Sequence, residues 1–159
     1  MKTEPYQPRH LDGVATLIVP IQREEFGISI TYDDQPDLRD IPGFYQQGAG
    51  QFWVALEDDE VVGTIGLRDI GGGNAALRKM FVAAGYRGRE HGTAAALLAA
   101  LLDHARLAGL TAIYLGTTEK FLAAHRFYEK HGFALIGVDD LPPAFPLMKV
   151  DSRFYRLSL

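Results

Sequence analysis

The sequence predicts an α+β fold, in which a mixed, mostly antiparallel twisted sheet is flanked by about four helices. Segments with strand character come in the order strands, helix, strand, helix, strands, and both of these helical segments have a clear 3.6-residue periodicity. The chain has 159 residues, 47% of them hydrophobic, which is enough for a buried core and argues against disorder. We therefore expect one domain over residues 1–159.

The N-terminal third is expected to supply one edge strand and two helices. Residues 4–8 have the pattern of a short strand. Apolar residues then recur at helical spacing, namely Leu11, Val14, Leu17, Ile18 and Ile21. Pro20 limits or kinks this helix near its end, and Pro42 interrupts a second helix expected over residues 37–47.

The middle of the chain is expected to form three consecutive strands, over residues 51–57, 61–69 and 74–82. An acidic turn at residues 58–60 joins the first strand to the second. Three glycines at residues 71–73 form a flexible turn before the third strand.

Two longer helices follow, each of them between strands. The first is expected over residues 94–108 and ends at Gly109. Its apolar stripe consists of Ala94, Leu97, Leu98, Leu101, Leu102 and Ala105. The second helix is expected over residues 119–131, with Thr118 as its N-cap. The remaining strands are expected over residues 113–118, 133–138 and 153–159.

A basic loop that contains glycine connects the strand at residues 74–82 to the first long helix. The loop contains Arg87, Gly88, Arg89 and Gly92. A helix N-terminus offers unpaired N–H groups and partial positive charge, and glycine lets a ligand approach the backbone closely. The loop is therefore predicted to bind a phosphate or pyrophosphate, the alternative being a surface turn that happens to be basic. The spacing matches neither a P-loop nor a dinucleotide-binding motif.

Two segments resemble motifs of the GNAT N-acetyltransferases. Residues 87–92, Arg-Gly-Arg-Glu-His-Gly, are similar to the family's acyl-CoA pyrophosphate loop, commonly Gln/Arg-x-x-Gly-x-Gly/Ala, although Glu90 replaces the first glycine. Residues 124–133 are similar to the family signature Ala-x-x-x-Tyr-x-x-x-Gly-Phe, in which Tyr128 is the tyrosine. Phe121 stands where the family often has asparagine. The resemblance covers about residues 50–138.

The resemblance implies an N-acetyltransferase that uses acetyl-CoA as cosubstrate and needs no metal. A primary amine attacks the thioester directly in a ternary complex, and Tyr128 protonates the departing CoA thiolate. The alternative for Tyr128 is an aromatic residue at the edge of the core whose hydroxyl is satisfied locally. The strand near residues 80–82 is expected to splay from its neighbour and to offer backbone N–H groups. The CoA-binding residues implied in this way are Met80, Phe81, Val82, Arg87, Gly88, Arg89, Glu90, His91, Gly92 and Thr93.

The general base is not identified by either motif. Many members of the family have a glutamate on the fourth strand, and that position is Ala76 here. The resemblance therefore implies a base that acts through water. The candidates are Glu25, Asp69, Glu119 and His125. His125 is more readily explained as a partly exposed surface histidine.

The resemblance also places the acceptor, a small-molecule or peptide amine, between the first two helices and the loop before the last strand. These segments supply Phe26, Ile28, Tyr32, Phe44, Tyr45 and the largely apolar residues 141–148. Four carboxylates in the same segments could attract a cationic amine, or are solvated turn residues. They are Asp33, Asp34, Asp139 and Asp140.

Charge and composition exclude several other functions. A net charge of -4 argues against a nucleic-acid partner, and the absence of cysteine excludes disulfides, cysteine-ligated metals and an acyl-cysteine intermediate. Residues 1–10 lack a signal-peptide core and residues 94–102 are too few to cross a bilayer, so we expect a cytoplasmic protein without a membrane partner. A homodimer is left open. Two other functions stay open: a non-catalytic acyl-CoA-binding sensor or interaction module of the same fold, and a nucleotide-binding regulator.

Overall fold

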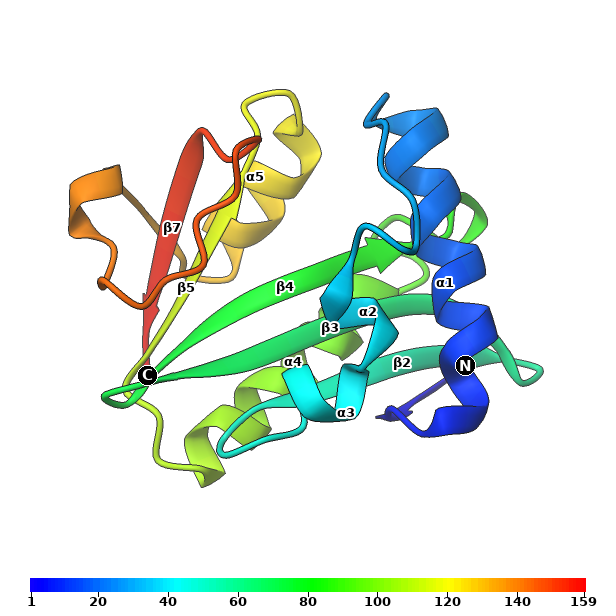
Figure 1. Cartoon of the computed structure of the whole chain (residues 1–159), viewed down its shortest axis with the longest axis horizontal. Coiled ribbons are helices and arrows are strands. Elements are labelled where there is room, and N and C mark those ends of the chain that lie inside the picture. Colours follow the sequence, from blue (N-terminus) through cyan, green and yellow to red (C-terminus); the bar gives the residue numbers. More distant parts are fainter.

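A seven-stranded sheet forms the centre of the molecule, with its strands in the order β1-β2-β3-β4-β5-β7-β6 (Figure 1). The computed structural model describes residues 1–159. Neighbouring strands are antiparallel except β4 and β5, which run parallel, so the predicted mixed and mostly antiparallel sheet is confirmed. The strands are β1 (Lys2–Pro5), β2 (Gln51–Glu57), β3 (Glu60–Gly71), β4 (Asn74–Val82), β5 (Ala112–Thr117), β6 (Ala134–Ile136) and β7 (Arg153–Ser158).

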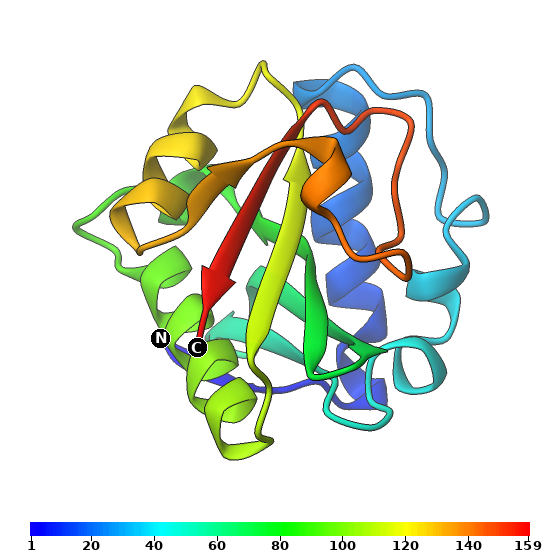
Figure 2. The same ribbon diagram turned by 90° about the vertical axis from the view of Figure 1, so that its left-hand side faces the viewer.

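Helices cover both faces of the sheet, and Figure 2 shows α1 on one side with α4 and α5 on the other. A π-helical turn, η2 (Ile21–Glu25), continues α1 beyond Pro20. None of the helices combines the length and apolar character that a bilayer crossing requires. The α-helices are α1 (Leu11–Pro20), α2 (Pro36–Arg39), α3 (Ile41–Phe44), α4 (Thr93–Leu107) and α5 (Leu122–Lys130), and the short 3₁₀ helices are η1 (Pro8–His10), η3 (Ala84–Tyr86) and η4 (Val138–Asp140).

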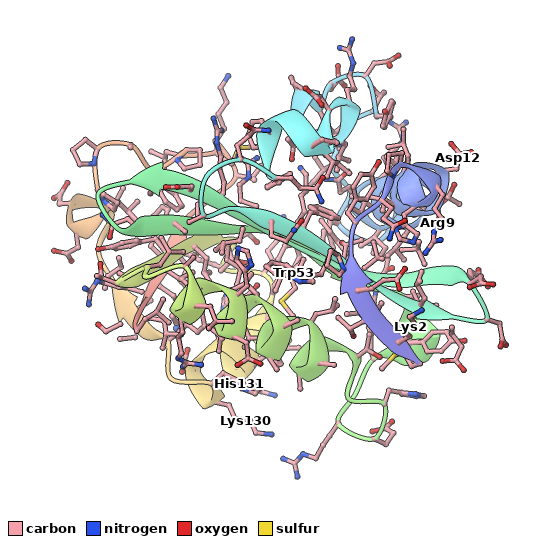
Figure 3. All side chains as sticks on the ribbon, turned by 90° about the horizontal axis from the view of Figure 1, so that it is seen from below. Lys2, Arg9, Asp12, Trp53, Lys130 and His131 are labelled. Atoms are coloured by element: carbon pink, nitrogen blue, oxygen red, sulfur yellow. The ribbon has the colours of Figure 1, made fainter.

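The core has two parts, one on each face of the sheet. Strand β2 contributes to both parts, because successive strand residues point to opposite faces. Trp53 and Ala55 belong to the cluster under α4, whereas Phe52 and Val54 belong to the cluster under α1. Trp53 lies between the sheet and α4 (Figure 3), where its ring centre is 5.3 Å from that of His104. Burial on both faces therefore fixes the register of the central strands.

Strands β4 and β5 are paired only at their beginnings. The paired residues are Asn74 with Ala112, Ala75 with Ile113, and Ala76 with Tyr114. Beyond these pairs the two strands diverge, and α5 moves away from β4 together with β5 (Figure 1). The splay that the resemblance implies near residues 80–82 is therefore present. It leaves the facing backbone edges of both strands without a partner strand.

Two N-terminal elements differ from the sequence prediction. Strand β1 ends at Pro5 rather than at residue 8, because the chain enters η1 at Pro8. The helix predicted over residues 37–47 is two short helices, α2 and α3. The side chain of Asp40 accepts the N–H of Gly43 at 3.0 Å and so starts α3 directly after α2.

Helix α5 begins at Leu122, later than predicted, and Thr118 is not its N-cap. The hydroxyl of Thr118 accepts the N–H of Lys120 at 3.1 Å, which holds this segment in a turn. Such local side-chain bonds compete with helix formation. The strand predicted over residues 133–138 is also shorter and covers Ala134–Ile136.

Two leucines of α4 test the predicted core face of this helix. Leu101 is completely buried, whereas Leu107 is 90% exposed. Leu101→Ala should lower the free energy of unfolding by about 2–5 kcal/mol, because it removes buried methyl groups and leaves a cavity. Leu107→Ala, the matched control, should change it by less than about 0.5 kcal/mol. Urea denaturation measures both, and equal effects would contradict the assignment of the core.

Candidate active site

A cavity of about 960 Å³ opens where β4 and β5 diverge. Its wall consists of the end of β4, the loop that leads to α4, the end of β5, helix α5 and the segment before β7. Phe26 and Ile28, which follow α1, close one side. The cavity thus brings together segments that are far apart in the sequence. Both sequence motifs lie in these segments.

The N-terminus of α4 presents free backbone donors to this cavity. The N–H groups of Thr93, Ala94 and Ala95 have no acceptor within the chain, and no side chain caps the helix. Gly92, the N-cap, has φ 66° and Gly88 has φ 102°, conformations that favour glycine. Unpaired N–H groups at the start of a helix of this length form an anion site.

The lining of the cavity is strongly cationic. Its basic residues are Arg78, Lys79, Arg87, Arg89, Lys120 and Lys130. Lys130 and His131 lie at the end of α5 (Figure 3), and both contribute to the lining. Asp151 is the only carboxylate among the lining residues. A cavity with this balance favours anionic ligands.

Arg87 does not point freely into the cavity. Its guanidinium binds Glu25 through two hydrogen bonds of 2.7 and 2.9 Å, and its Nε donates to the carbonyl of Val82 at 2.8 Å. The hydrogen bonds from Arg87 lower the pKa of the Glu25 carboxyl. Glu25 therefore holds the basic loop against the end of η2, and it does not line the cavity.

Tyr128 lies in the wall of the cavity on α5, with 7% of its surface exposed. Its hydroxyl has one weak polar contact, to the Met80 sulfur at 3.8 Å. Phe133 and Tyr155 pack against its ring at centre distances of 5.6 and 6.0 Å. Burial raises the pKa of the Tyr128 phenol well above its usual value of 10.0, so the hydroxyl stays protonated over the physiological range.

None of the four candidate bases named from the sequence lines the cavity. The prediction of a partly exposed His125 is wrong, because its side chain is 4% exposed and its Nε2 lies 2.7 Å from the Thr118 carbonyl oxygen. Asp69 accepts the N–H groups of Ala49 and Gly71 and so holds a turn.

Asp151 was missed by the sequence analysis. It precedes β7, and its carboxylate lies against Gly116 on β5, where a Cβ atom would come within 2.5 Å of Oδ2. That oxygen accepts the N–H of Met148 at 3.3 Å. Burial raises the pKa of the Asp151 carboxyl, while the charge of Arg78 opposes this effect. The dipeptide Asp-Ser before a strand has no local pattern that would predict a carboxylate in the wall of a cavity.

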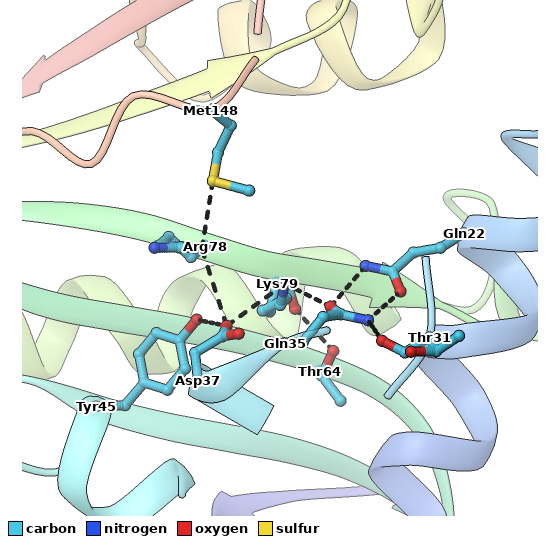
Figure 4. A network of polar contacts seen from close by, with 9 residues as sticks. All are labelled: Gln22, Thr31, Gln35, Asp37, Tyr45, Thr64, Arg78, Lys79 and Met148. Atoms are coloured by element: carbon cyan, nitrogen blue, oxygen red, sulfur yellow. Dashed lines mark hydrogen bonds and ion pairs between the residues drawn. The ribbon is translucent and has the colours of Figure 1, made fainter. Parts of the chain in front are cut away.

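A polar network surrounds the two cations of β4 (Figure 4). Lys79 Nζ donates to Gln35 Oε1 at 2.8 Å and lies 3.4 Å from Asp37 Oδ2. Arg78 lies 3.9 Å from the same Asp37 oxygen, which also accepts the Tyr45 hydroxyl at 2.6 Å. Burial lowers the pKa of Lys79, and Asp37 opposes this effect.

Most of the predicted CoA-binding residues meet at this cavity. Those in the lining are Met80, Phe81, Val82, Arg87, Gly88, Arg89 and Gly92. Glu90 lies outside, with its carboxylate folded back over Gly88. His91 packs against Tyr86 at 5.9 Å between ring centres, and the buried Thr93 hydroxyl contacts Met1.

The predicted acceptor residues are only partly assembled. Phe26 and Ile28 line the cavity, as do Phe145, Pro146 and Met148 from the segment before β7. The aromatic residues Tyr32, Phe44 and Tyr45 do not, and pack around α2 and α3. Of the two alternatives for the four aspartates, the structure favours solvated turn residues, because all four are exposed and lie outside the cationic lining.

Comparison with known proteins is consistent with this geometry. Residues 16–133 match the model of the acetyltransferase (GNAT) family. An acetyltransferase of the GNAT family from Staphylococcus aureus Mu50 has a solved structure that is 39% identical, with a TM-score of 0.93 over 99% of this chain and 98% of that one. N-acetylglutamate synthase from Neisseria gonorrhoeae, solved with coenzyme A and N-acetyl-glutamate, shares the fold at 16% identity and a TM-score of 0.76, over 99% of this chain and 35% of that one.

Among curated proteins, N-acetylaspartate synthetase from Xenopus tropicalis is 40% identical over 125 residues. The match includes 76% of this chain but only 45% of the relative. The chain thus spans less than half the length of this relative.

Proposed function

The chain belongs to the GNAT family of acetyltransferases, and we propose that it transfers the acetyl group of acetyl-CoA to a primary amine in a ternary complex. The observation that carries the proposal is the gap between β4 and β5. This gap joins the unpaired N–H groups of α4 to the protonated hydroxyl of Tyr128 through one cavity. An anion site for the pyrophosphate and a proton donor for the leaving thiolate in one cavity are what acetyl transfer from acetyl-CoA requires.

In this proposal the pyrophosphate of acetyl-CoA binds the loop at residues 87–93 and the first turn of α4. The pantetheine arm follows the free edge of β4 at Met80–Val82, where backbone donors are available. A backbone N–H at this edge would stabilise negative charge on the thioester oxygen as the amine attacks. The protein's part is thus to position two reactants and to stabilise developing charge.

Two protons move in this reaction, one to the departing thiolate and one from the amine, and one residue handles each. The amine nitrogen forms a bond to the acetyl carbon, and the carbon–sulfur bond breaks. Tyr128 donates its proton to the departing CoA thiolate. We assign the proton from the attacking amine to Asp151, because it is the only carboxylate in the lining. Its pKa, raised by burial, makes it a stronger base than an exposed aspartate.

A non-catalytic acyl-CoA-binding module would use the same anion site. Two departures from the family pattern, Ala76 and Glu90, favour that alternative. Asp151 in the lining, and the position of Glu90 outside it, support catalysis. Release of CoA thiol from acetyl-CoA in the presence of an amine panel separates the two functions. Aspartate belongs in that panel, because it is the acceptor that the name of the Xenopus relative indicates.

Two substitutions test the site proposed for acetyl-CoA by calorimetric titration with CoA. Gly92→Val should weaken binding at least roughly tenfold, because φ 66° disfavours a β-branched residue and the side chain would enter the anion site. Glu25→Gln should free Arg87 and tighten binding by up to about fivefold, an effect that salt should reduce. Glu24→Gln is the control. Unchanged affinity in both test variants would place the CoA site elsewhere.

Tyr128→Phe should lower kcat by roughly 10²-fold, the lower end of the range for a lost general acid, because a thiolate leaves more readily than an alkoxide. CoA affinity should change little, since the ring is retained. Because burial raises the pKa of Tyr128, kcat should not fall near the ordinary tyrosine pKa of 10.0. Steady-state kinetics with the best amine measures both, with Tyr86→Phe as control. A wild-type kcat in Tyr128→Phe would make this tyrosine structural.

Asp151→Asn should also lower kcat by roughly 10²-fold, because the amine loses its proton acceptor. In the wild type, kcat should rise with pH through the pKa of Asp151, at a value above 3.8, since only the carboxylate accepts a proton. The variant should lack this limb of the pH profile. Asp139→Asn, in the exposed η4, is the control. An unchanged pH profile in Asp151→Asn would assign the base to another group.

A further inference from the structure

Two consecutive cations, Arg78 and Lys79, line the same cavity, although strand alternation would place neighbours on opposite faces. The cause is a bulge: the pairing of β3 with β4 shifts between Thr64 and Gly66, and Lys79 has φ 53°. A bulge re-aims a side chain, and a left-handed conformation at lysine has an energetic cost. The backbone of β4 is thus distorted where it presents two positive charges.

Within ion-pair distance these two cations meet only one negative charge, although Asp151 also acts on Arg78 from farther away. Asp37 is the only carboxylate paired with either cation, at 3.4 Å from Lys79 and 3.9 Å from Arg78. The Lys79 side chain is 9% exposed and that of Arg78 is 15% exposed. Excess charge with so little hydration is costly unless a further anion neutralises it. The Arg78–Asp37 distance of 3.9 Å is too long for a hydrogen bond, so most guanidinium donors of Arg78 remain available to a ligand.

The ammonium group of Lys79 is held in place by neighbouring polar side chains, of which Gln22 also lines the cavity (Figure 4). Gln35 accepts from Lys79 and exchanges hydrogen bonds of 2.8 and 3.0 Å with Gln22. Thr64 donates to the backbone carbonyl of Lys79 at 2.7 Å, which secures the bulge. The network therefore fixes the cation at the cavity.

Met148 connects these cations to Asp151. Its sulfur lies 3.8 Å from Arg78, and its backbone N–H donates to the Asp151 carboxylate at 3.3 Å. The positive Arg78 and the negative Asp151 thus lie on either side of Met148, one on each side of the gap between β4 and β5. A ligand with a carboxylate and an amine separated by a short carbon chain matches this arrangement.

We infer that Arg78 and Lys79 form a carboxylate subsite, and that the acceptor is an amino acid rather than a simple or cationic amine. The carboxylate of the acceptor binds the two cations, and its amine lies toward Asp151 and the thioester. Gln22, Gln35 and Asp37 position Lys79. This inference rests on the proposed acetyltransferase function, whose acceptor it specifies.

Matched acceptors that differ by one carboxylate test the subsite. L-alanine should have a kcat/KM at least roughly 10²-fold higher than ethylamine, and L-aspartate should exceed β-alanine. Lys79→Met and Arg78→Met should each reduce the ratio for L-alanine over ethylamine roughly 10²-fold, mainly through KM for L-alanine. Lys79→Arg should retain most of the preference. Lys149→Met, an exposed change of equal charge outside the lining, should leave the ratio unaltered.

A higher kcat/KM for ethylamine or for a diamine than for the amino acids would overturn the carboxylate subsite while leaving the acetyltransferase function intact. If no amine releases CoA thiol, the proposed function fails instead. Calorimetric titration of L-aspartate into the CoA-loaded protein then still tests the subsite. Binding that Lys79→Met abolishes supports it, and binding that is absent or is equal in Lys79→Met overturns it. Circular dichroism of both methionine variants checks that they fold.

Discussion

The active site depends on the point where β4 and β5 stop pairing, after Ala76 and Tyr114. Before that point the two strands are part of a continuous sheet with a core on each face. Beyond it the strands diverge and leave backbone edges, a cavity and the start of α4 next to one another. Helices α1 and α4 pack on β3 and β4, so the opening costs only a few backbone hydrogen bonds between β4 and β5.

Charge is distributed so that the two ends of the cavity have different anion-binding character. At the loop before α4, backbone N–H groups and exposed arginines suit a phosphate, which retains much of its hydration. At the bulge in β4, nearly buried cations are fixed by Gln35 and Asp37 and suit a smaller, desolvated anion. The net charge of -4 of the whole chain does not indicate this local excess of positive charge.

The sequence predicted the features that local patterns determine. The strand at residues 74–82, the basic loop and α4 were predicted almost to the residue, because periodicity and glycine positions are local signals. Contacts between distant residues could not be predicted in this way. The pairs Lys79–Gln35 and Arg87–Glu25 are separated by 44 and 62 residues, and the positions of Asp151 and His125 depend on packing between elements. The cationic lining at the acceptor end was therefore not predicted from the sequence.

A crystal structure of the protein with bound CoA is the most direct test of the central claim, that the gap between β4 and β5 is the site of acyl transfer. The thiol should lie in this gap, within reach of the Tyr128 hydroxyl. The pyrophosphate should lie on the N–H groups of Thr93, Ala94 and Ala95, with Arg87 released from Glu25. Cofactor density outside the gap, or β4 and β5 paired along their full length, would contradict the account.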